Sequence, residues 1–349
     1  MQIDRHIISQ DSPLMQALAM LNKLSGGVMT LIVTAPDGRM SGTLTDGDVR
    51  RALLSGVGLD APVTDAMCRN FHSLCADSIT PMSVSRIRDK GIRLIPVLDH
   101  DGHVVRLIDT CRTRTILPVG AILMAGGKGE RLRPMTLSTP KPLLKIGGKP
   151  IIDYNIEALS AVGVTDITVT VNYLAGQIEA HFAEPVGGVR VRCVREDKPL
   201  GTIGSASLVD LPEEGDTIVM NSDLLTSISF ENLYMRHVSE KADITIAAVP
   251  YNVSVPYAIL ATDGERVVSL EEKPSYSYYA NAGIYLFSNR LLRSLDPDTR
   301  TDATDLIESA ISQGLKVTYY PINGTWIDIG SPADFAHACE LMAHLRQTR

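Results

Sequence analysis

The sequence has no hydrophobic run long enough to cross a membrane. No stretch approaches the roughly 18 consecutive apolar residues that a spanning helix requires. The N-terminus begins Met-Gln-Ile-Asp-Arg-His and lacks the apolar core behind a basic end that marks a secretory signal. Together these two absences predict a cytoplasmic protein that has no membrane partner.

Cysteine is scarce, and its spacing is not that of a metal site. The five cysteines form an odd set without a Cys-x-x-Cys pair, which predicts reduced thiols rather than disulfides or bound zinc. Basic charge is also in deficit, because the formal net charge is −7 and no long basic run is present. This balance argues against nucleic acid as the partner.

The length and composition allow two globular domains. A chain of 349 residues with 44% apolar and 21% charged residues is typical of a folded protein with about two domains. A short polar joint at residues 112–118 separates two parts with different patterns. We therefore predict one domain at 1–117 and a second at 118–349.

The most strongly patterned stretch lies near the middle of the chain. Residues 119–124 form a short apolar run typical of a buried strand, and Gly126, Gly127 and Gly129 follow it. Glycines let backbone N–H groups approach an anion closely, because no Cβ blocks the way. Residues 128–149 carry six basic side chains against one acidic one. This local excess of positive charge predicts a small anionic ligand, such as a phosphate.

Further residues follow this glycine loop at fixed spacing. Arg131 and Pro134 come first, and Lys141 is then held in a stiff, non-helical frame between Pro140 and Pro142. The block is neither a Walker A loop nor a Rossmann fingerprint, and it resembles the signature of the sugar-1-phosphate nucleotidyltransferases. The resemblance implies that Arg131 and Lys141 hold the triphosphate and polarise its α-phosphate. It also implies that the nucleotide is bound by Met124, Ala125, Gly126, Gly127 and Gly129.

Two aspartates match the magnesium ligands of the same family. Asp223 follows an apolar strand, and Asp328 stands between Trp326 and Gly330. Taken alone, each would be a cap or turn residue, because aspartate is frequent at such places. The resemblance implies that both bind Mg²⁺, which prefers few protein carboxylates together with substrate phosphate oxygens. The sugar phosphate is itself the nucleophile, so no Ser-His-Asp arrangement is needed, and none is found.

The segment 196–205 resembles the base-reading loop of this family, with Glu196 and Gly201 at the matching positions. A carboxylate accepts hydrogen bonds from the N1–H and N2–H₂ edge of guanine, whereas it would repel the carbonyls of uracil or thymine. This chemistry favours GTP as the donor. Two other roles stay open for Glu196, namely a salt bridge with Lys198 and a position in solvent.

The segment Glu271-Glu-Lys-Pro274 resembles the sugar-phosphate clamp of the family. The resemblance implies that Glu272 binds sugar hydroxyls and Lys273 the phosphate, with Asn281 following at the expected distance. Without the preceding motifs these charges would be read as a solvated run. Ala258 stands where many relatives have glycine. This difference leaves the identity of the sugar open, but it does not change the expected reaction.

The first 117 residues repeat one pattern twice, at about 1–58 and 59–117, each with a helix, a strand, an Asp-Gly turn and a second strand. The segment 42–51 resembles part of a tandem CBS (Bateman) module, an α+β fold. The resemblance implies that Thr45 and Asp48 hold a regulatory nucleotide, and the second copy lacks this element. These side chains could also only cap a helix, and such a module could serve only to pair subunits.

From residue 119 onward, predicted strands alternate with helices, which indicates a Rossmann-like α/β domain whose mainly parallel sheet binds its ligand at the carboxyl ends of the strands. We expect helices at 151–162, 174–182, 202–208, 230–239 and 332–345, and strands at 166–171, 189–194, 217–220 and 244–249.

With a CBS pair ahead of it, the whole chain looks most similar to the glucosamine-1-phosphate guanylyltransferases of bacterial legionaminic acid synthesis. The resemblance implies a Mg²⁺-dependent homo-oligomer that transfers a nucleoside monophosphate from a nucleoside triphosphate to a sugar 1-phosphate. GTP is the favoured donor, and glucosamine 1-phosphate is the favoured acceptor. The alternatives are mannose, heptose or glucose phosphate with GTP, UTP or dTTP. A nucleotide-sensing regulator whose second domain only binds is the alternative from another functional class.

Overall fold

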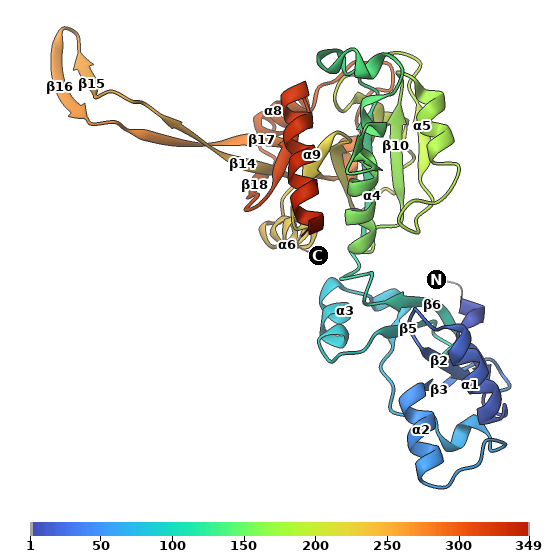
Figure 1. Ribbon diagram of the computed structural model, residues 1–349. Helices are drawn as coiled ribbons and strands as arrows, with labels where there is room; N and C mark the ends of the chain where they lie inside the picture. Colours follow the sequence, from blue (N-terminus) through green and yellow to red (C-terminus); the bar gives the residue numbers. More distant parts are fainter. Residues whose placement is uncertain (1–2, 348–349) are drawn as a thin grey trace. The chain divides into compact units, whose positions relative to one another are not determined.

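The computed structural model describes residues 3–347 and divides the chain into two compact units (Figure 1). The first unit holds the chain up to Leu117 together with Ala161–Gly163. The second holds Pro118–Ser160 and the chain from Val164 onward. No helix within 3–347 is both long and apolar enough to span a bilayer.

The first unit contains the same arrangement twice. In each three-stranded sheet the first strand pairs parallel with the second, and the second pairs antiparallel with the third. The first sheet and its helices are β1 (Ile7–Ser9), α1 (Leu14–Lys23), β2 (Thr30–Thr34), β3 (Met40–Thr45) and α2 (Asp46–Leu54). The second comprises β4 (Leu74–Cys75), α3 (Pro81–Arg88), β5 (Leu94–Leu98) and β6 (Val104–Asp109).

Hydrophobic packing joins these two halves of the first unit. Val28 and Ile32 from the first half pack against Leu94 and Leu107 from the second, and all four side chains are buried. Each of the two antiparallel strand pairs turns at an Asp-Gly sequence, and the turn glycines adopt positive φ angles of 83° and 87°. The Asp-Gly turns expected from the sequence are therefore confirmed, because a positive φ is readily available to glycine.

The second unit is built on a seven-stranded sheet of order β11-β10-β7-β12-β17-β14-β18. β17 runs antiparallel to both of its neighbours, and the other pairings in this sheet are parallel. The mainly parallel α/β fold is thus confirmed. The strands are β7 (Val119–Ala125), β10 (Ile167–Val171), β11 (Arg192–Arg195), β12 (Asp216–Asn221), β14 (Ile244–Ser254), β17 (Ser275–Ser288) and β18 (Val317–Pro321).

Helices and short strands complete the second unit. The helices are α4 (Ile151–Ala161), α5 (Ala175–His181), α6 (Phe230–Glu240), α7 (Asn289–Arg293), α8 (Ala303–Ser312) and α9 (Pro332–Gln347). Three short pairs of strands are β8 (Lys145–Ile146) with β9 (Lys149–Pro150), β13 (Leu224–Thr226) with β19 (Trp326–Asp328), and β15 (Ile259–Asp263) with β16 (Arg266–Glu271).

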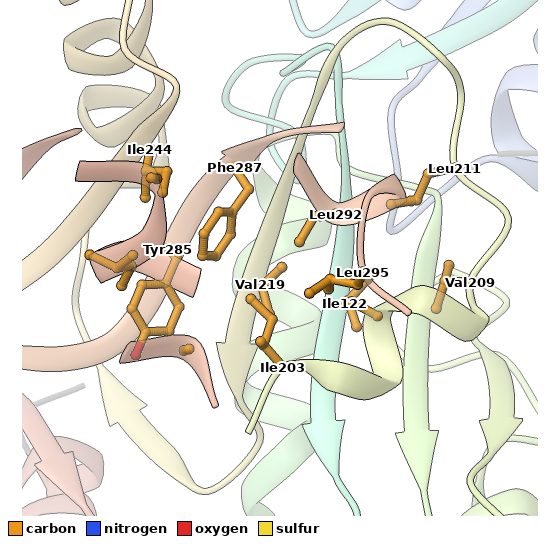
Figure 2. Packing of buried hydrophobic residues seen from close by; sticks show 14 residues of the cluster. Ile122, Ile203, Val209, Leu211, Val219, Ile244, Tyr285, Phe287, Leu292 and Leu295 are labelled. Atoms are coloured by element: carbon orange, nitrogen blue, oxygen red, sulfur yellow. The ribbon is translucent and has the colours of Figure 1, made fainter. Parts of the chain in front are cut away.

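A buried cluster on the central strands stabilises the second unit (Figure 2). Ile122 of β7, Val219 of β12 and Phe287 of β17 are each at most 1% exposed. Leu292 and Ile203 pack on the same cluster from outside the sheet. Truncating one such aromatic side chain to alanine costs about 3–5 kcal/mol. The cluster therefore holds the strands, and the loops at their ends, in fixed positions.

Two expected elements differ from those observed. Residues 202–208 were expected as an α-helix, and the structure has a 3₁₀-helix at Gly204–Leu208, because the N–H groups of Ile203 and Gly204 both bond to the Thr301 carbonyl. The strand expected at 189–194 is Arg192–Arg195. Val189 instead pairs with Val186 across a tight turn whose glycines have φ angles of 59° and 81°.

β14 and β17 continue beyond the sheet as a two-stranded ribbon, which ends in the β15–β16 hairpin (Figure 1). The pairing runs without a break from Ala248 opposite Asn281 to Ser254 opposite Ser275. Side chains at 250–254 and 275–281 are exposed on both faces. We call residues 250–281 the arm. The sequence had indicated only a strand at 244–249 in this region.

Candidate active site

A cavity of about 880 Å³ opens at the carboxyl ends of β7 and β12. These strands are parallel neighbours, and Met124 lies opposite Asn221 at their ends. The glycine loop after β7 and Asp223 after β12 therefore share one edge of the sheet. The predicted residues that line the cavity are Met124, Ala125, Gly126, Gly127, Gly129, Arg131, Lys141, Glu196, Gly201 and Asp223.

The glycine loop is packed too closely for side chains at two positions. A Cβ at Gly126 would lie 2.7 Å from the Glu196 carboxylate. Gly129 has a φ of 60°, and a Cβ there would lie 3.0 Å from the side chain of Thr136. Around a Cβ on Gly127, by contrast, no described atom beyond its chain neighbours lies within 4 Å. The loop thus keeps its backbone open to the cavity at Gly127.

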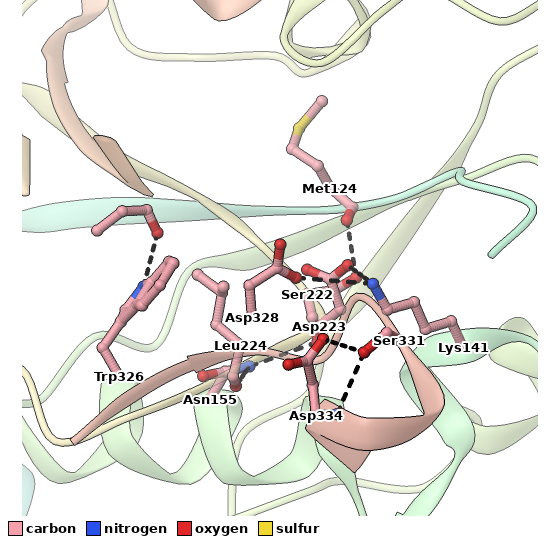
Figure 3. Close-up of polar contacts among 11 residues, drawn as sticks. Met124, Lys141, Asn155, Ser222, Asp223, Leu224, Trp326, Asp328, Ser331 and Asp334 are labelled. Carbon is pink, nitrogen blue, oxygen red and sulfur yellow. Dashed lines mark hydrogen bonds and ion pairs between the residues drawn. The ribbon is translucent and has the colours of Figure 1, made fainter. Parts of the chain in front are cut away.

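Lys141 lies between two carboxylates at the cavity (Figure 3). It begins the 3₁₀-helix Lys141–Leu143, and its side chain is only 11% exposed. Its ammonium group forms an ion pair with Asp223 and lies 3.8 Å from Asp328. A lysine between two prolines is therefore aimed into the site, where it neutralises negative charge.

Hydrogen bonds to distant parts of the chain fix the backbone around Asp223. The hydroxyl of Ser222 donates to the Met124 carbonyl at 2.7 Å, which ties the end of β12 to that of β7. Asn155, buried on α4, donates to the Leu224 carbonyl at 3.0 Å (Figure 3). These bonds hold the turn that carries Asp223 from both sides.

Asp328 reaches the same place from a distant part of the chain. β13 pairs antiparallel with β19, and this register sets Leu224 opposite Asp328. The Ile329 N–H also donates to the Asp223 carbonyl at 3.2 Å. Two aspartates far apart in the sequence are thus brought to one ammonium group by a two-stranded pairing.

The negative charge of Asp223 and Asp328 is compensated only in part by the neighbouring basic side chains. Burial and the negative charge of Asp223 raise the pKa of Asp328, while Lys141 and Arg131 oppose that shift. One oxygen of Asp223, Oδ1, is buried without a hydrogen-bond partner. A buried, unpaired carboxylate oxygen is costly unless a cation or donor meets it. The two aspartates therefore suit a hard divalent cation.

Glu196 is buried at the cavity wall, with 7% of its surface exposed. Burial raises its pKa, and the Leu200 N–H, which donates to its Oε2 at 3.2 Å, opposes that shift. Lys198 forms its ion pair with Asp298 at 3.1 Å. Neither of the other two roles considered for Glu196, a salt bridge with Lys198 or a position in solvent, is observed.

Two residues of the cavity, Arg300 and Asp302, were missed by the sequence analysis. Asp302 accepts a hydrogen bond from the Thr202 N–H at 2.9 Å, and a Cβ at Gly201 would collide with the Thr301 carbonyl. The loop at 196–205 therefore packs on the segment before α8. Asp302 and Asp305 form a capping box at the start of α8, a pattern that predicts a helix start but no cavity contact.

The residues predicted to bind the sugar phosphate do not line this cavity within one copy of the chain. Glu272 and Lys273 are exposed on the arm, and Lys273 has a left-handed φ of 45°. Asn281 lies at the base of the arm, where its amide donates to the Tyr285 hydroxyl at 2.9 Å. Their contact with a sugar phosphate stays a prediction.

Thr45 and Asp48 line a separate cavity of about 490 Å³ in the first unit. They also form the capping box of α2, because the Asp48 N–H donates to Thr45 Oγ1 at 3.3 Å and the Thr45 N–H donates to Asp48 Oδ2 at 2.8 Å. Residues of both halves line this cavity, including Arg93 from the second. The pair is thus both a helix cap and part of a cavity wall.

Comparison with known proteins addresses the second unit. Residues 120–344 match the sequence profile of the nucleotidyl transferase family, which covers more than half of the chain. The chain belongs to the nucleotidyl transferase family. The match starts at residue 120, so residues 1–119 lie outside it, and the CBS resemblance of the first unit stays a prediction.

Similar proteins from this family include guanylyltransferases. The chain is 34% identical to the probable mannose-1-phosphate guanylyltransferase 1 of Oryza sativa subsp. japonica over 227 residues, 62% of each chain. It is 30% identical to the mannose-1-phosphate guanyltransferase beta-A of Xenopus laevis over 237 residues, 65% of this chain and 66% of that one. The chain spans less than two thirds of the length of these relatives.

A solved structure is also similar to part of the chain. HddC from Yersinia pseudotuberculosis superposes with a TM-score of 0.51 and 25% sequence identity, over 64% of this chain and 99% of that one. Nearly the whole of that protein therefore corresponds to part of this chain.

Proposed function

We propose that this protein transfers a nucleoside monophosphate from a nucleoside triphosphate to a sugar 1-phosphate and releases pyrophosphate, with GTP as the preferred donor. The observation that carries the proposal is the grouping of Lys141 and Asp223 beside an open glycine loop in one cavity, with Asp328 3.8 Å from the Lys141 ammonium group. Positive charge and paired carboxylates at one place suit a reaction between two polyphosphate anions.

The reaction requires two anions to approach each other. An oxygen of the sugar phosphate attacks the α-phosphorus of the nucleotide, and the bond from that phosphorus to the bridging oxygen of pyrophosphate breaks. Arg131 and Lys141 provide fixed positive charge at the cavity, which lowers the repulsion between the reactants. The open backbone at Gly127 gives the triphosphate N–H donors. Covalent chemistry by a protein nucleophile is not needed.

Asp223 and Asp328 would hold Mg²⁺ in this proposal. The unpaired Oδ1 of Asp223 and the closeness of a second carboxylate support this assignment. When bound, the ion would neutralise phosphate oxygens of the nucleotide. Lys141 then positions both carboxylates and shares their charge.

Glu196 supports guanine as the base. Its carboxylate lines the cavity beside Gly126, where an ionised oxygen can accept from N1–H and N2–H₂. Gly201 lines the same wall, and there a side chain would collide with the Thr301 carbonyl. The guanylyltransferases among the similar proteins agree with this choice of base.

For the acceptor we propose glucosamine 1-phosphate, on the resemblance of the whole chain, and mannose 1-phosphate as the second candidate. The names of the similar proteins favour the second. Glu272 and Lys273 would bind the hydroxyls and the phosphate of either sugar, with Asn281 beside them.

A panel of substrates tests this function. Release of pyrophosphate is measured for all pairs of GTP, ATP, UTP and dTTP with glucosamine, mannose, heptose and glucose 1-phosphates, in the presence of Mg²⁺. We expect the highest kcat/KM for GTP with one of the first two sugars. A preference for UTP or dTTP would reject the role of Glu196 in reading the base. If no pair of substrates releases pyrophosphate, the proposed transferase function is wrong, and the alternative of a nucleotide-binding regulator is favoured.

The cavity at Thr45 and Asp48 is proposed to bind a regulatory nucleotide. Its lining combines these polar side chains with Arg93, which offers positive charge for a phosphate. The variant Asp48→Ala should lose binding of adenine or guanine nucleotides at this cavity and any change that they cause in the transferase rate. Unchanged binding and kinetics for all of these nucleotides would show that Asp48 only caps α2, where its loss costs about 1 kcal/mol.

A further inference from the structure

The arm exposes an unusual amount of apolar surface. Its 32 residues carry ten of the 22 exposed large hydrophobic side chains among the described residues. Tyr257 is 75% exposed, Tyr251 61% and Tyr278 59%. Single exposed apolar residues are ordinary, whereas a concentrated group marks an interaction surface. The arm therefore has the apolar composition of a buried element, although its side chains are exposed.

The arm is also unsuited to stand alone in water. A two-stranded ribbon is marginally stable at best unless a third strand or a packing surface covers one face. At roughly 100 Å² for each exposed aromatic or aliphatic side chain, the arm offers on the order of 1,000 Å² of apolar area. This is comparable with the roughly 800 Å² that each partner buries in a stable protein interface. Something of protein size must cover it.

The charge of the arm points to the surface that it fits. Four acidic residues, Asp263, Glu265, Glu271 and Glu272, stand against Arg266 and Lys273, so the net charge of the arm is −2. The segment 128–149, part of which lines the cavity, has six basic residues against one acidic residue and a net charge of +5. Opposite charges steer two surfaces together and fix their register. The lining of the cavity itself carries four basic side chains against four acidic ones, so the complementary surface for the arm is the basic segment 128–149 at its edge rather than the whole cavity.

The arm cannot reach its own cavity as it is folded. Seven consecutive residue pairs join its strands to the end of the central sheet, and Figure 1 shows it, in orange, projecting away from the helices of the second unit. To fold back it would have to break this ladder. From residue 250 to the tip at 264 it spans about 50 Å of extended chain. That length exceeds the radius of gyration of about 16 Å for a body of roughly 200 residues, so it can cross a neighbouring body.

We propose that two copies of this chain exchange arms, so that the arm of each lies across the cavity of the other. Lys273 and Glu272 of one copy then complete the sugar-phosphate part of the partner's site, which explains why they are absent from the cavity of a single copy. The role of these two residues rests on the proposed function, whereas the exchange itself does not. Reciprocal exchange closes under twofold symmetry and leaves no free arm.

The backbone of Lys273 agrees with this assignment. Its left-handed φ of 45° is uncommon for a side chain larger than glycine and costs on the order of 1 kcal/mol. Such strain persists where the surroundings impose it, and it is frequent at ligand-binding positions. The buried Pro274 follows directly, and its carbonyl accepts from the Val255 N–H at 2.9 Å. The clamp residues are thus held in a fixed turn rather than on a free loop.

Photo-cross-linking of the full-length chain tests the exchange directly. Tyr257, midway along the arm, is replaced by p-benzoylphenylalanine, and Ile311 on α8, which is 57% exposed, receives the same residue as the control. We expect irradiation of the Tyr257 variant to give a product of twice the chain mass, linked to peptides of the second unit, and the Ile311 variant to give none. Cross-links confined to a single chain, or no link between chains, would overturn the exchange.

A mixed dimer tests whether the arm completes the partner's site. Asp223→Asn and Lys273→Ala are each expected to be nearly inactive, and a dimer of one chain of each is isolated with two different affinity tags. With exchanged arms, one of its two sites has both an intact body and an intact arm, so about half of the wild-type activity should return. No recovery, or a Lys273→Ala variant with an unchanged KM for the sugar phosphate, would overturn the role of the arm.

These two experiments separate the exchange from the proposed function. If the wild-type protein releases no pyrophosphate with any pair of substrates, the proposed function fails, and the cross-linking result still decides the exchange. If the wild-type protein is active and the mixed dimer is inactive, each active site is formed by a single chain. The proposed function then stands, and the exchange does not complete the site.

Discussion

Replacing Lys141 by methionine removes the ammonium group that lies between Asp223 and Asp328. The side chain of Lys141 is 11% exposed, and those of the aspartates are 23% and 42% exposed. Methionine keeps an unbranched chain of similar length and fills the same space, so the main change is in charge. Two partly buried carboxylates are left facing each other, one of them with an unpaired oxygen.

The cost follows from this burial. Removing one partner of a fully buried ion pair costs about 3–5 kcal/mol. Because both carboxylates keep some contact with water, we expect a loss on the order of 2 kcal/mol in the free energy of unfolding without Mg²⁺. In a domain of this size, such a loss lowers the thermal midpoint by about 4–8 °C.

Thermal unfolding in EDTA and in Mg²⁺ is the assay, with the exposed Lys145→Met on the same basic segment as the control. Added Mg²⁺ should raise the midpoint of Lys141→Met more than that of the wild type, because the cation takes over the neutralising charge. The rate of pyrophosphate release should fall by about 10²–10³-fold. A variant as stable as the wild type in EDTA, or one with no larger response to Mg²⁺, would refute the placement of charge at this site.

Four further predictions follow from the described contacts. Glu196→Gln should lower kcat/KM for GTP by about 10- to 100-fold, because an amide presents a donor where guanine needs an acceptor. Because burial raises the pKa of Glu196, it takes up a proton at higher pH than an exposed glutamate, so the KM for GTP should rise on acidification in the wild type but not in Glu196→Gln. Gly129→Ala, at a φ of 60° and 3.0 Å from Thr136, should cost about 1–2 kcal/mol in urea unfolding. Phe287→Ala, in the central cluster, should cost about 3–5 kcal/mol in the same assay, and a loss below 1 kcal/mol would contradict its burial.

The parts of the site that depend on local sequence were predictable. The apolar run before Gly126 predicted a buried strand, and the glycine spacing predicted a loop with an open backbone. The structure has both, with β7 ending at Ala125 and the loop at the cavity. Local patterns suffice here because strand formation and backbone freedom depend on neighbouring residues.

The joining of distant residues was not predictable from spacing. Asp223 and Asp328 meet because β13 pairs with β19, and only the family resemblance indicated that they share a site. Asp302 reaches Thr202 across 100 residues of sequence through packing between loops. Such contacts depend on the tertiary fold, which is set by the whole core rather than by a short segment.

The arm shows a different limit. Its residues alternate tyrosine and valine with polar residues, which favours strands, and the structure forms them. What the pattern lacks is any sign of which surface covers the strands. The sequence therefore indicated the clamp motif at 271–274 but not its position on a ribbon outside the body.

The initial rate of pyrophosphate release from GTP and a sugar 1-phosphate, with and without Mg²⁺, tests the central claim most directly. We predict turnover by the wild-type protein in Mg²⁺, none in EDTA, and a loss of at least about 100-fold in a folded Asp223→Asn variant. Equal rates for Asp223→Asn and the wild type, or turnover that does not respond to removal of the metal, would contradict it.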